Sequence, residues 1–428
     1  MSETSDNFIR AASVPMDGSW HVTGTLDEAK TTLASHPSLA SHSIYTAAVL
    51  GNDSAIRQFI QTDAASATRQ GGPYNWDALT YLCFSKYLRL EKERSAGFVS
   101  SATMLLDAGA DPNTGFFSDD HLPTPTFESA LYGAAGVAHH DDMTKLLLDR
   151  GADPNDGETE YHSPEWFNRR PMELIVESGR LKPIGLVTML ARKLDWTDYD
   201  GVVWLLDHGA DPNMLSLWGA RALDHSIGRD NRIEFIETLL AHGANPLLTA
   251  ADGTNAFMRA AAAGRMDVIK SFEKHGFRYR LEGPAAFLEA SARGNIDLAR
   301  EIAADNAEII SALKRDHPDV LANFAGAGNT KGVATLLDLG FDIESRSAHP
   351  GSKGNTALHL AVWRDRLDTV KLLVERGASL ESTNPDGDTA FDLARRAQKE
   401  GSEWTPHETS RVLNYLEKFN NIGRLQRP

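Results

Sequence analysis

The pentapeptide Gly-Ala-Asp-Pro-Asn starts at Gly109, at Gly151 and at Gly209, and the close variant Gly-Ala-Asn-Pro starts at Gly243. A weaker echo follows at Gly276, so that Gly209 and Gly243 are 34 residues apart and Gly243 and Gly276 are 33 apart. A fixed period of about 20–50 residues is typical of repeat proteins, whose units stack on one another. The sequence therefore predicts a chain built from stacked units.

The residues before each glycine follow a pattern of their own. Gly354-Asn-Thr-Ala-Leu-His-Leu-Ala-Val and Asp368-Thr-Val-Lys-Leu-Leu-Val precede Gly377, and Asp252-Gly-Thr-Asn-Ala-Phe-Met-Arg-Ala-Ala precedes Gly276. This resembles the ankyrin repeat, with T-P-L-H-x-A-A on a first helix and V-x-x-L-L on a second. The resemblance implies an all-α fold, a right-handed solenoid of about eleven helix-turn-helix units with short finger loops.

Three domain segments are expected. Residues 1–42 are predicted as an N-terminal helical cap, with a short helix that opens at the capping box Thr25-Leu-Asp-Glu28. Residues 43–400 are predicted as the ankyrin-repeat solenoid. Residues 401–428 are predicted as a C-terminal capping helix, over 408–419, and a tail.

Some parts of the solenoid depart from the regular unit. Residues 86–98, rich in Lys, Arg and Glu, are predicted as an insertion between two helices. Long finger loops are predicted at 113–128 and at 155–170. Insertions in repeat proteins collect on one face, which is often the binding face.

Part of the N-terminal half also resembles a group of bacterial ankyrin proteins. The residues that carry this resemblance are Gly71-Gly-Pro-Tyr-Asn-Trp76, Tyr81-Leu-Cys-Phe-Ser85 and Leu131-Tyr-Gly-Ala-Ala-Gly136. It covers roughly residues 40–160 and implies no activity.

Composition argues against several functions. The chain has 59 acidic and 43 basic residues and a formal net charge of -16, whereas nucleic-acid binding needs a basic surface. The single cysteine, Cys83, permits neither an internal disulfide nor a cysteine-based zinc site. No stretch approaches the roughly 18 apolar residues of a membrane span, and the N-terminus lacks a secretory profile, so a cytoplasmic location is expected.

No cofactor or metal is expected. Nucleotide-binding and metalloprotease motifs are absent from the sequence. His139 and His140 stand beside Asp141 and Asp142, but they fall where the ankyrin pattern has Gly-His before the second helix. The two aspartates fall in the first turn of that helix, where acids suit the helix dipole.

We expect the concave groove to bind a protein segment or an acidic small ligand. Aromatic anchors would supply contact area, and arginines and lysines on the groove-facing positions of the first helices would supply orientation. The alternative is that these cations pair with acids on neighbouring finger loops. The predicted ligand-binding residues are Trp76, Tyr81, Phe84, Phe116, Phe117, Trp166, Arg192, Lys193, His225, Arg229, Arg259, Glu289, Arg293, Asn323, Trp363 and Arg364.

A second function stays open at this point. Paired carboxylates near aromatic side chains could perform acid/base chemistry on an extended substrate such as an oligosaccharide. Ankyrin repeats are usually scaffolds, so binding is the first hypothesis and an enzyme is the alternative. The candidate catalytic residues on the fingers are Asp119, Asp120, Glu128, Asp156, Glu158 and His162.

Overall fold

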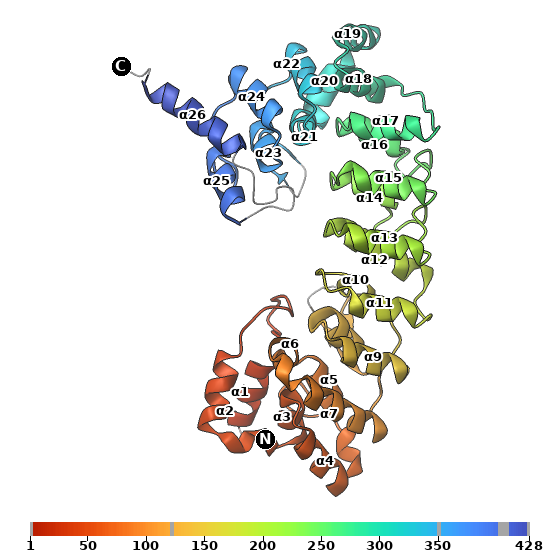
Figure 1. Ribbon diagram of the computed structural model, residues 1–428, viewed down its shortest axis with the longest axis vertical. Helices are drawn as coiled ribbons and strands as arrows, with labels where there is room; N and C mark the ends of the chain where they lie inside the picture. Colours follow the sequence, from red (N-terminus) through yellow and green to blue (C-terminus); the bar gives the residue numbers. More distant parts are fainter. Residues whose placement is uncertain (1–2, 120–123, 349–351, 401–410, 426–428) are drawn as a thin grey trace. The chain divides into compact units, whose positions relative to one another are not determined.

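A computed structural model of the chain describes all residues except 1–2, 120–123, 349–351, 401–410 and 426–428 (Figure 1). The chain divides into two compact units, Met1–Leu217 and Trp218–Pro428. Each unit is mostly helical, as the repeat pattern predicts. The predicted number of about eleven repeats and the predicted domain limits stay predictions.

The N-terminal unit consists of short helices in pairs, preceded by two further helices and interrupted by one β-hairpin. Its elements are α1 (Glu3–Ala12), α2 (Asp27–Ser35), η1 (Pro37–Ser41), α3 (Ile44–Leu50), α4 (Asp53–Thr62), η2 (Ala64–Ala67), α5 (Ala78–Cys83), α6 (Lys86–Leu90), η3 (Lys92–Arg94), α7 (Ser95–Asp107), β1 (Gly115–Ser118), β2 (Thr126–Ser129), α8 (Ala130–Tyr132), η4 (Gly133–Val137), α9 (Asp141–Asp149), α10 (Glu158–His162), α11 (Arg170–Glu177), α12 (Pro183–Asp195) and α13 (Tyr199–Asp207).

The C-terminal unit continues the helix pairs. Figure 1 shows α14 to α17 stacked in order, and first helices pack on first helices, as α14 does on α16 and α21 on α23. The elements are α14 (Ala222–Gly228), α15 (Ile233–Ala241), α16 (Ala256–Ala262), α17 (Met266–Lys274), α18 (Gly283–Ala292), α19 (Ile296–Asp305), α20 (Glu308–Asp316), α21 (Val320–Gly326), α22 (Thr330–Asp338), α23 (Ala357–Trp363), α24 (Leu367–Glu375), α25 (Ala390–Glu400) and α26 (Arg411–Leu425).

The repeated glycines end the second helices for a reason of backbone conformation. Gly109, Gly209 and Gly243 have φ angles of 97°, 94° and 86°, in the left-handed region that favours glycine. A Cβ atom added at these positions would meet no heavy atom within 4 Å. Because space is available, it is the positive φ alone that requires glycine here.

The segment predicted as an N-terminal helical cap contains α1 as well as α2. The capping box predicted at Thr25 is not formed, since α2 begins at Asp27 with no side-chain cap. The Thr25 hydroxyl instead donates to Asp27 Oδ2 at 2.8 Å. Because α2 begins at Asp27, its N-cap position is Leu26, and Thr25 lies one residue too early to cap the helix.

The predicted insertion at 86–98 forms α6, η3 and the first turn of α7, which begins at Ser95. Its basic residues bind the N-terminal segment. Lys86 Nζ donates to the Ala11 carbonyl at 3.1 Å, and Arg89 Nη2 donates to the carbonyls of Thr23 and Gly24 at 2.9 and 3.0 Å. The basic composition of the insertion thus serves contacts with backbone oxygens within the unit.

The two long finger loops differ from the prediction in structure. Over 113–128, β1 and β2 form an antiparallel pair, with Phe117 opposite Phe127, so the fold is not purely α-helical. Residues 155–170 are not a loop throughout, because α10 lies within them. The acids at Glu158 and Glu160 suggest a solvated segment, but Glu160 is buried.

Asp230 joins distant turns of the C-terminal unit. It stands in the turn between α14 and α15 with a φ of 53°, and its carboxylate is buried. Its oxygens accept from Arg265 Nη1 at 2.7 Å and from Arg364 Nη1 at 2.8 Å. Arg364 follows α23 directly, so one carboxylate connects turns 134 residues apart.

Candidate functional site

The segment after Gly276 departs from the repeated pentapeptide, and this departure creates the candidate site. In a regular unit the aspartate folds back on the turn, as when Asp211 Oδ1 accepts from Asn213 N at 2.8 Å. The corresponding residue after Gly276 is Arg278, whose Nη1 donates to the carbonyls of Glu273 and Phe277 at 2.5 and 2.7 Å. The finger therefore begins with Arg278, Tyr279 and Arg280, all of them exposed.

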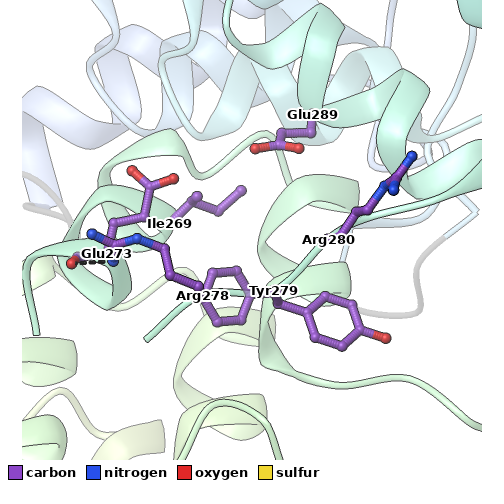
Figure 2. Close-up of a pocket in the computed structure, with 7 residues that line it drawn as sticks. Ile269, Glu273, Arg278, Tyr279, Arg280 and Glu289 are labelled. Atoms are coloured by element: carbon purple, nitrogen blue, oxygen red, sulfur yellow. Dashed lines mark hydrogen bonds between the residues drawn. The ribbon is translucent and has the colours of Figure 1, made fainter. Parts of the chain in front are cut away.

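A pocket with a volume of about 290 Å³ lies at this segment (Figure 2). Figure 2 shows Glu289 reaching in from α18, Ile269 and Glu273 from α17, and the arginines and tyrosine from the connecting segment. The rings of Phe257 and Tyr279 stack with centroids 5.9 Å apart, and Tyr279 keeps 45% of its surface exposed. The residues that line this Tyr279 pocket are Phe257, Ile269, Glu273, Arg278, Tyr279, Arg280 and Glu289.

The charges around the Tyr279 pocket are not fully balanced. Glu273 and Glu289 both bind Arg293 Nη2, at 3.0 and 2.6 Å. Burial would lower the pKa of Arg293, but its bonds to the two glutamates outweigh burial and raise it. Within the described part of the chain, neither Arg278 nor Arg280 forms an ion pair, so two cationic groups at the pocket have no carboxylate partner.

Most cations of the predicted line are paired with acids, but among these partners only Glu165 and Asp252 lie on finger loops, where the alternative hypothesis put them. This pairing weakens the local positive field that an acidic ligand along the predicted groove would need. The pairs are Arg192 with Glu165 at 2.5 Å and Asp195 at 2.6 Å, Lys193 with Asp198 at 2.7 Å, Arg259 with Asp252 at 2.8 Å, Arg293 with Glu289 at 2.6 Å, and Arg364 with Asp230 at 2.8 Å.

Four of the predicted aromatic anchors belong to the core. Tyr81 and Phe84 are fully buried, and Trp76 and Phe116 are nearly so, with their rings stacked 4.2 Å apart. These rings pack on one another inside the unit, as Phe84 does on Phe116 with ring centroids 4.9 Å apart. They cannot contact a ligand on the surface of the folded unit, and the prediction that they do is wrong.

The remaining predicted groove residues vary in exposure. Phe117 and Trp166 are exposed, at 71% and 50% of their surface. His225 is partly exposed and stacks on Trp218 with ring centroids 6.4 Å apart, and Asn323 Nδ2 donates to Asp319 at 3.0 Å. Trp363 is partly buried against the core of its unit.

Among the residues that the structure describes, the predicted catalytic acids are either exposed or held in contacts with their neighbours. Asp119 is exposed, Asp120 lies outside the described residues, and Glu128 is buried with one oxygen 3.9 Å from His21 Nδ1. Asp156 binds the Ser129 hydroxyl and accepts from Thr159 N at 2.6 Å, so it supports the start of α10. The Tyr279 pocket and a second pocket beside α1 are both lined by other residues.

Glu158 and His162 do meet, in a cluster on α10 and the residues after it. His162 Nε2 lies 3.2 Å from Glu158 and its Nδ1 lies 3.2 Å from Glu165. Burial would lower the pKa of His162, but the two carboxylates outweigh burial and raise it to about 9. The imidazolium is therefore an ion-pair partner at neutral pH rather than a proton acceptor.

Arg278, Tyr279 and Arg280 are absent from the residues predicted from the sequence. Only Glu289, of the predicted groove residues, lines the Tyr279 pocket. A signal is present in the sequence, since Phe-Arg-Tyr-Arg follows Gly276 where the four preceding units have Ala-Asp-Pro-Asn or Ala-Asn-Pro, although the segments after Gly340 and Gly377 also depart from this pattern. A break in a repeated turn sequence identifies a surface that the repeat's own structure does not require.

Comparison with known proteins supports the repeat assignment. Residues 287–384 match the family model described as ankyrin repeats (3 copies). A putative ankyrin repeat protein of Fowlpox virus is 35% identical over 118 residues, which cover 27% of this chain and 34% of that protein. The Notch-regulated ankyrin repeat-containing protein of Xenopus tropicalis is 40% identical over 67 residues, which cover 16% of this chain and 59% of that protein.

Two further matches extend over more of the chain. A Caenorhabditis elegans homolog of transient receptor potential cation channel subfamily A member 1 is 24% identical over 173 residues, covering 40% of this chain and 14% of that protein. The human ASB11 ankyrin repeat domain aligns with a TM-score of 0.24 at 18% identity, covering 54% of this chain and 96% of that one.

The chain matches only part of each of these relatives. The chain spans less than two thirds of the length of each curated relative named above. They come from eukaryotes and a virus, so the resemblance to a bacterial group is not supported. Over the described residues, every helix is too short or too polar to cross a bilayer.

Proposed function

Because this chain carries ankyrin repeats, we propose that it is a binding scaffold and that the Tyr279 pocket holds a segment of a partner protein. The observation that carries the proposal is the combination, in one pocket, of a half-exposed aromatic ring with two arginines that lack carboxylate partners among the described residues. Tyrosine and arginine are among the residue types that dominate the energetics of protein interfaces.

The apolar part of the pocket favours a side chain over a free ion. Phe257 and Ile269 are buried beneath it, and Tyr279 forms its exposed wall. An aliphatic or aromatic side chain of the partner would remove this surface from water, at about 25 cal/mol per Å². The pocket of about 290 Å³ admits one such side chain rather than a folded domain.

The charge favours a carboxylate next to that apolar side chain. Arg280 is exposed and has a planar fork that pairs a carboxylate through two hydrogen bonds. Arg278 is held by backbone carbonyls, which leave its positive charge uncompensated. The acidic ligand expected from the sequence thus keeps its support, but at Arg278 and Arg280 instead of along the predicted line of first helices.

The proposed ligand is therefore an extended protein segment in which an apolar residue stands beside an acidic one. The expectations of a cytoplasmic location, and of no nucleic-acid partner, membrane contact or cofactor, stay predictions. The enzyme alternative is not proposed, because its candidate acids occupy structural contacts at Asp156, Glu158 and Glu128.

A peptide-array screen tests the proposal. Full-length protein is applied to random peptides that contain one aromatic or aliphatic residue beside one acidic residue, with the acid replaced by its amide as the paired probe. We expect the acidic members to bind and the amide members to bind at least about tenfold more weakly. Binding should also weaken as salt rises, since the Debye length is about 8 Å at 0.15 M ionic strength.

Substitutions of the residues that line the Tyr279 pocket then test whether the peptide binds there. Arg280→Gln and Tyr279→Ala should each weaken binding of a selected peptide by about tenfold, because the exposed side chains serve the ligand and not the fold. Arg300→Gln is the matched control, since Arg300 is exposed on α19 and does not line the pocket. Equal binding by the Arg280 variant, the Arg300 variant and the native protein would refute the pocket as the site.

A further inference from the structure

A second pocket lies in the N-terminal unit, and we call it the Lys86 pocket. Its volume is about 430 Å³, and its walls come from α1, the segment after α1, the start of α2, the turn before α5 and the start of α6. Backbone contacts join two of these walls, since Ser13 and Ser85 form a β-bridge and Val14 N donates to the Phe84 carbonyl at 3.0 Å. The pocket is therefore a fixed part of this unit.

Two cationic side chains line the Lys86 pocket, and both are held by backbone carbonyls. Lys86 Nζ donates to the Ala11 carbonyl at 3.1 Å, and Arg10 Nη2 donates to the Pro73 carbonyl at 3.2 Å. Over the described residues, neither cation forms an ion pair, and an ammonium group has three N–H donors and a guanidinium group five. Both side chains thus keep donors for an anionic group.

Two carboxylates line the same pocket. Asp17 Oδ1 accepts from Ser19 N at 3.1 Å, and Glu28 is exposed in the first turn of α2. Burial lowers the pKa of Lys86, and these two carboxylates oppose that change, so they lie within electrostatic reach of the ammonium group. In the part of the chain that the structure describes, neither carboxylate forms an ion pair. The pocket thus holds two cations and two anions that do not neutralise one another by direct contact.

Another part of the wall is apolar. Val14, Pro15 and Met16 follow α1 along the pocket, and Met16 keeps 37% of its surface exposed. Tyr74 is partly buried, with the guanidinium carbon of Arg10 4.9 Å from the centroid of its ring. An aliphatic group placed here is stabilised by about 25 cal/mol for each Å² of apolar surface that it removes from water. The pocket therefore offers apolar contact beside groups of both charges.

We infer that the Lys86 pocket binds a small zwitterion of the amino-acid class, either a free amino acid or a dipeptide with an apolar side chain. The ligand's carboxylate accepts from Lys86 and Arg10, and its ammonium group donates to Asp17 and Glu28. A simple anion meets the two carboxylates and a simple cation meets the two basic groups, so a ligand with both charges fits better than either.

The size of the pocket agrees with this class of ligand. Its volume of about 430 Å³ lies within the range of about 300–1,000 Å³ that is usual for small-molecule sites. The inference does not rest on the proposed function, because the Tyr279 pocket belongs to the other compact unit and is lined by different residues.

Ligand-observed NMR with the intact chain tests the inference. The probes are the proteinogenic amino acids and their glycyl dipeptides, each at up to about 10 mM, and calorimetry then measures the strongest binder. The N-acetylated form of that binder lacks the ammonium group, and its amide lacks the carboxylate. We expect saturable binding of the zwitterion and binding at least about tenfold weaker for both blocked forms, because each loses its charge-assisted hydrogen bonds.

Substitutions of exposed charged residues then test whether the zwitterion binds in this pocket. Arg10→Gln and Glu28→Gln each remove one charge from the wall, and each should weaken binding at least about tenfold. Arg57→Gln and Glu3→Gln are the matched controls, since both residues are exposed in the same unit and neither lines the pocket. Circular dichroism checks that all four variants keep the fold.

Each result decides the matter. Zwitterion binding that both blocked forms lose, and that the two pocket variants weaken while the two controls keep it, supports the inference. Absence of saturable binding by every probe, equal binding of a blocked form, or equal binding by the pocket variants and the controls overturns it. The test does not need a substitution of Lys86, whose bond to the Ala11 carbonyl also serves the fold.

Discussion

At the scale of single residues, burial decides which predicted groups can act. The position of Lys193 in the repeat predicts a groove-facing cation, yet the side chain is fully buried and bound to Asp198. Burial lowers its pKa, while the bond to Asp198 opposes this change. The sequence could not show this, because the partner acid stands in the next turn and the accepting carbonyl belongs to Trp166, 27 residues earlier.

Lys193→Met should destabilise the N-terminal unit strongly. The variant keeps the length of the side chain but removes the nearer cation of the buried Asp198, which keeps only Arg169 at 3.9 Å, and breaking one partner of a buried pair costs about 3–5 kcal/mol. The measurement is urea unfolding followed by circular dichroism. Lys145→Met is the control, since Lys145 pairs with Asp149 on an exposed surface and should change stability by less than about 1 kcal/mol. Equal stability of both variants would contradict the role of Lys193.

At the scale of elements, the repeat pattern predicts regular helices well and short irregular ones poorly. Ala256-Phe-Met-Arg-Ala-Ala-Ala262 is α16, and both alanines at 260 and 261 are fully buried, as a close helix contact requires. The helix α10 has five residues, three of them Glu or His, and its sequence predicts a loop. Its stability comes from contacts with residues outside it, such as Glu165, which no local pattern contains.

Ala260→Glu should destabilise the C-terminal unit by several kcal/mol. The carboxylate would enter a close contact between first helices, where it would be buried, and an unpaired buried charge is among the costliest substitutions. Ala262→Glu is the control on the same helix, because Ala262 is exposed. Thermal unfolding followed by circular dichroism compares the two. If the Ala260→Glu and Ala262→Glu variants have the same melting temperature, Ala260 does not lie in a close contact between first helices.

The cluster around α10 predicts a dependence of stability on pH. The folded-state pKa of His162 is raised to about 9 from an ordinary 6.5, so its stabilisation is complete below pH 6.5 and is lost as pH rises through 9. Burial raises the pKa of Glu160 to about 7, so folding is penalised as that group ionises. The His162 effect lowers stability between pH 6.5 and 9, and the Glu160 effect lowers it between pH 4.5 and 7, whereas His139, with its pKa lowered to about 4, acts between pH 4 and 6.5.

Chemical unfolding at a series of pH values measures this dependence. We expect the free energy of unfolding to fall by an amount on the order of 1–3 kcal/mol from neutral pH to about pH 9. Glu160→Gln removes one of the two titrating groups without a large change of shape, so its curve should be flatter than that of the native protein near pH 7. A native curve that rises over this range would contradict the assigned pKa directions.

At the scale of the whole molecule, the repeated sequence predicts that the stabilising interactions of each unit are with the units next to it. Each helix pair packs mainly on its neighbours, so stability is close to a sum of unit and interface contributions. The spacing of the repeats and the glycines that end the second helices predict this architecture from the sequence, because they are local features repeated along the chain. The Asp230 contact with Arg364 could not be predicted in this way, since no spacing rule links a turn to one 134 residues later.

The double variant Lys193→Met with Ala260→Glu tests whether substitutions in the two compact units affect the free energy of unfolding independently. The two residues belong to different compact units, and the bonds that hold Lys193 all lie within its own unit. Substitutions at separate sites usually add to within about 0.5 kcal/mol, whereas residues in one network show coupling of about 0.5–3 kcal/mol. Because the units of a solenoid interact mainly with their neighbours, we expect the double variant's loss of unfolding free energy to equal the two single losses within that smaller margin. Hydrogen exchange should then show lowered protection near α12 from the first change and near α16 from the second. A coupling of more than about 1 kcal/mol, or loss of protection in both units from a single change, would mean that the units unfold as one cooperative body.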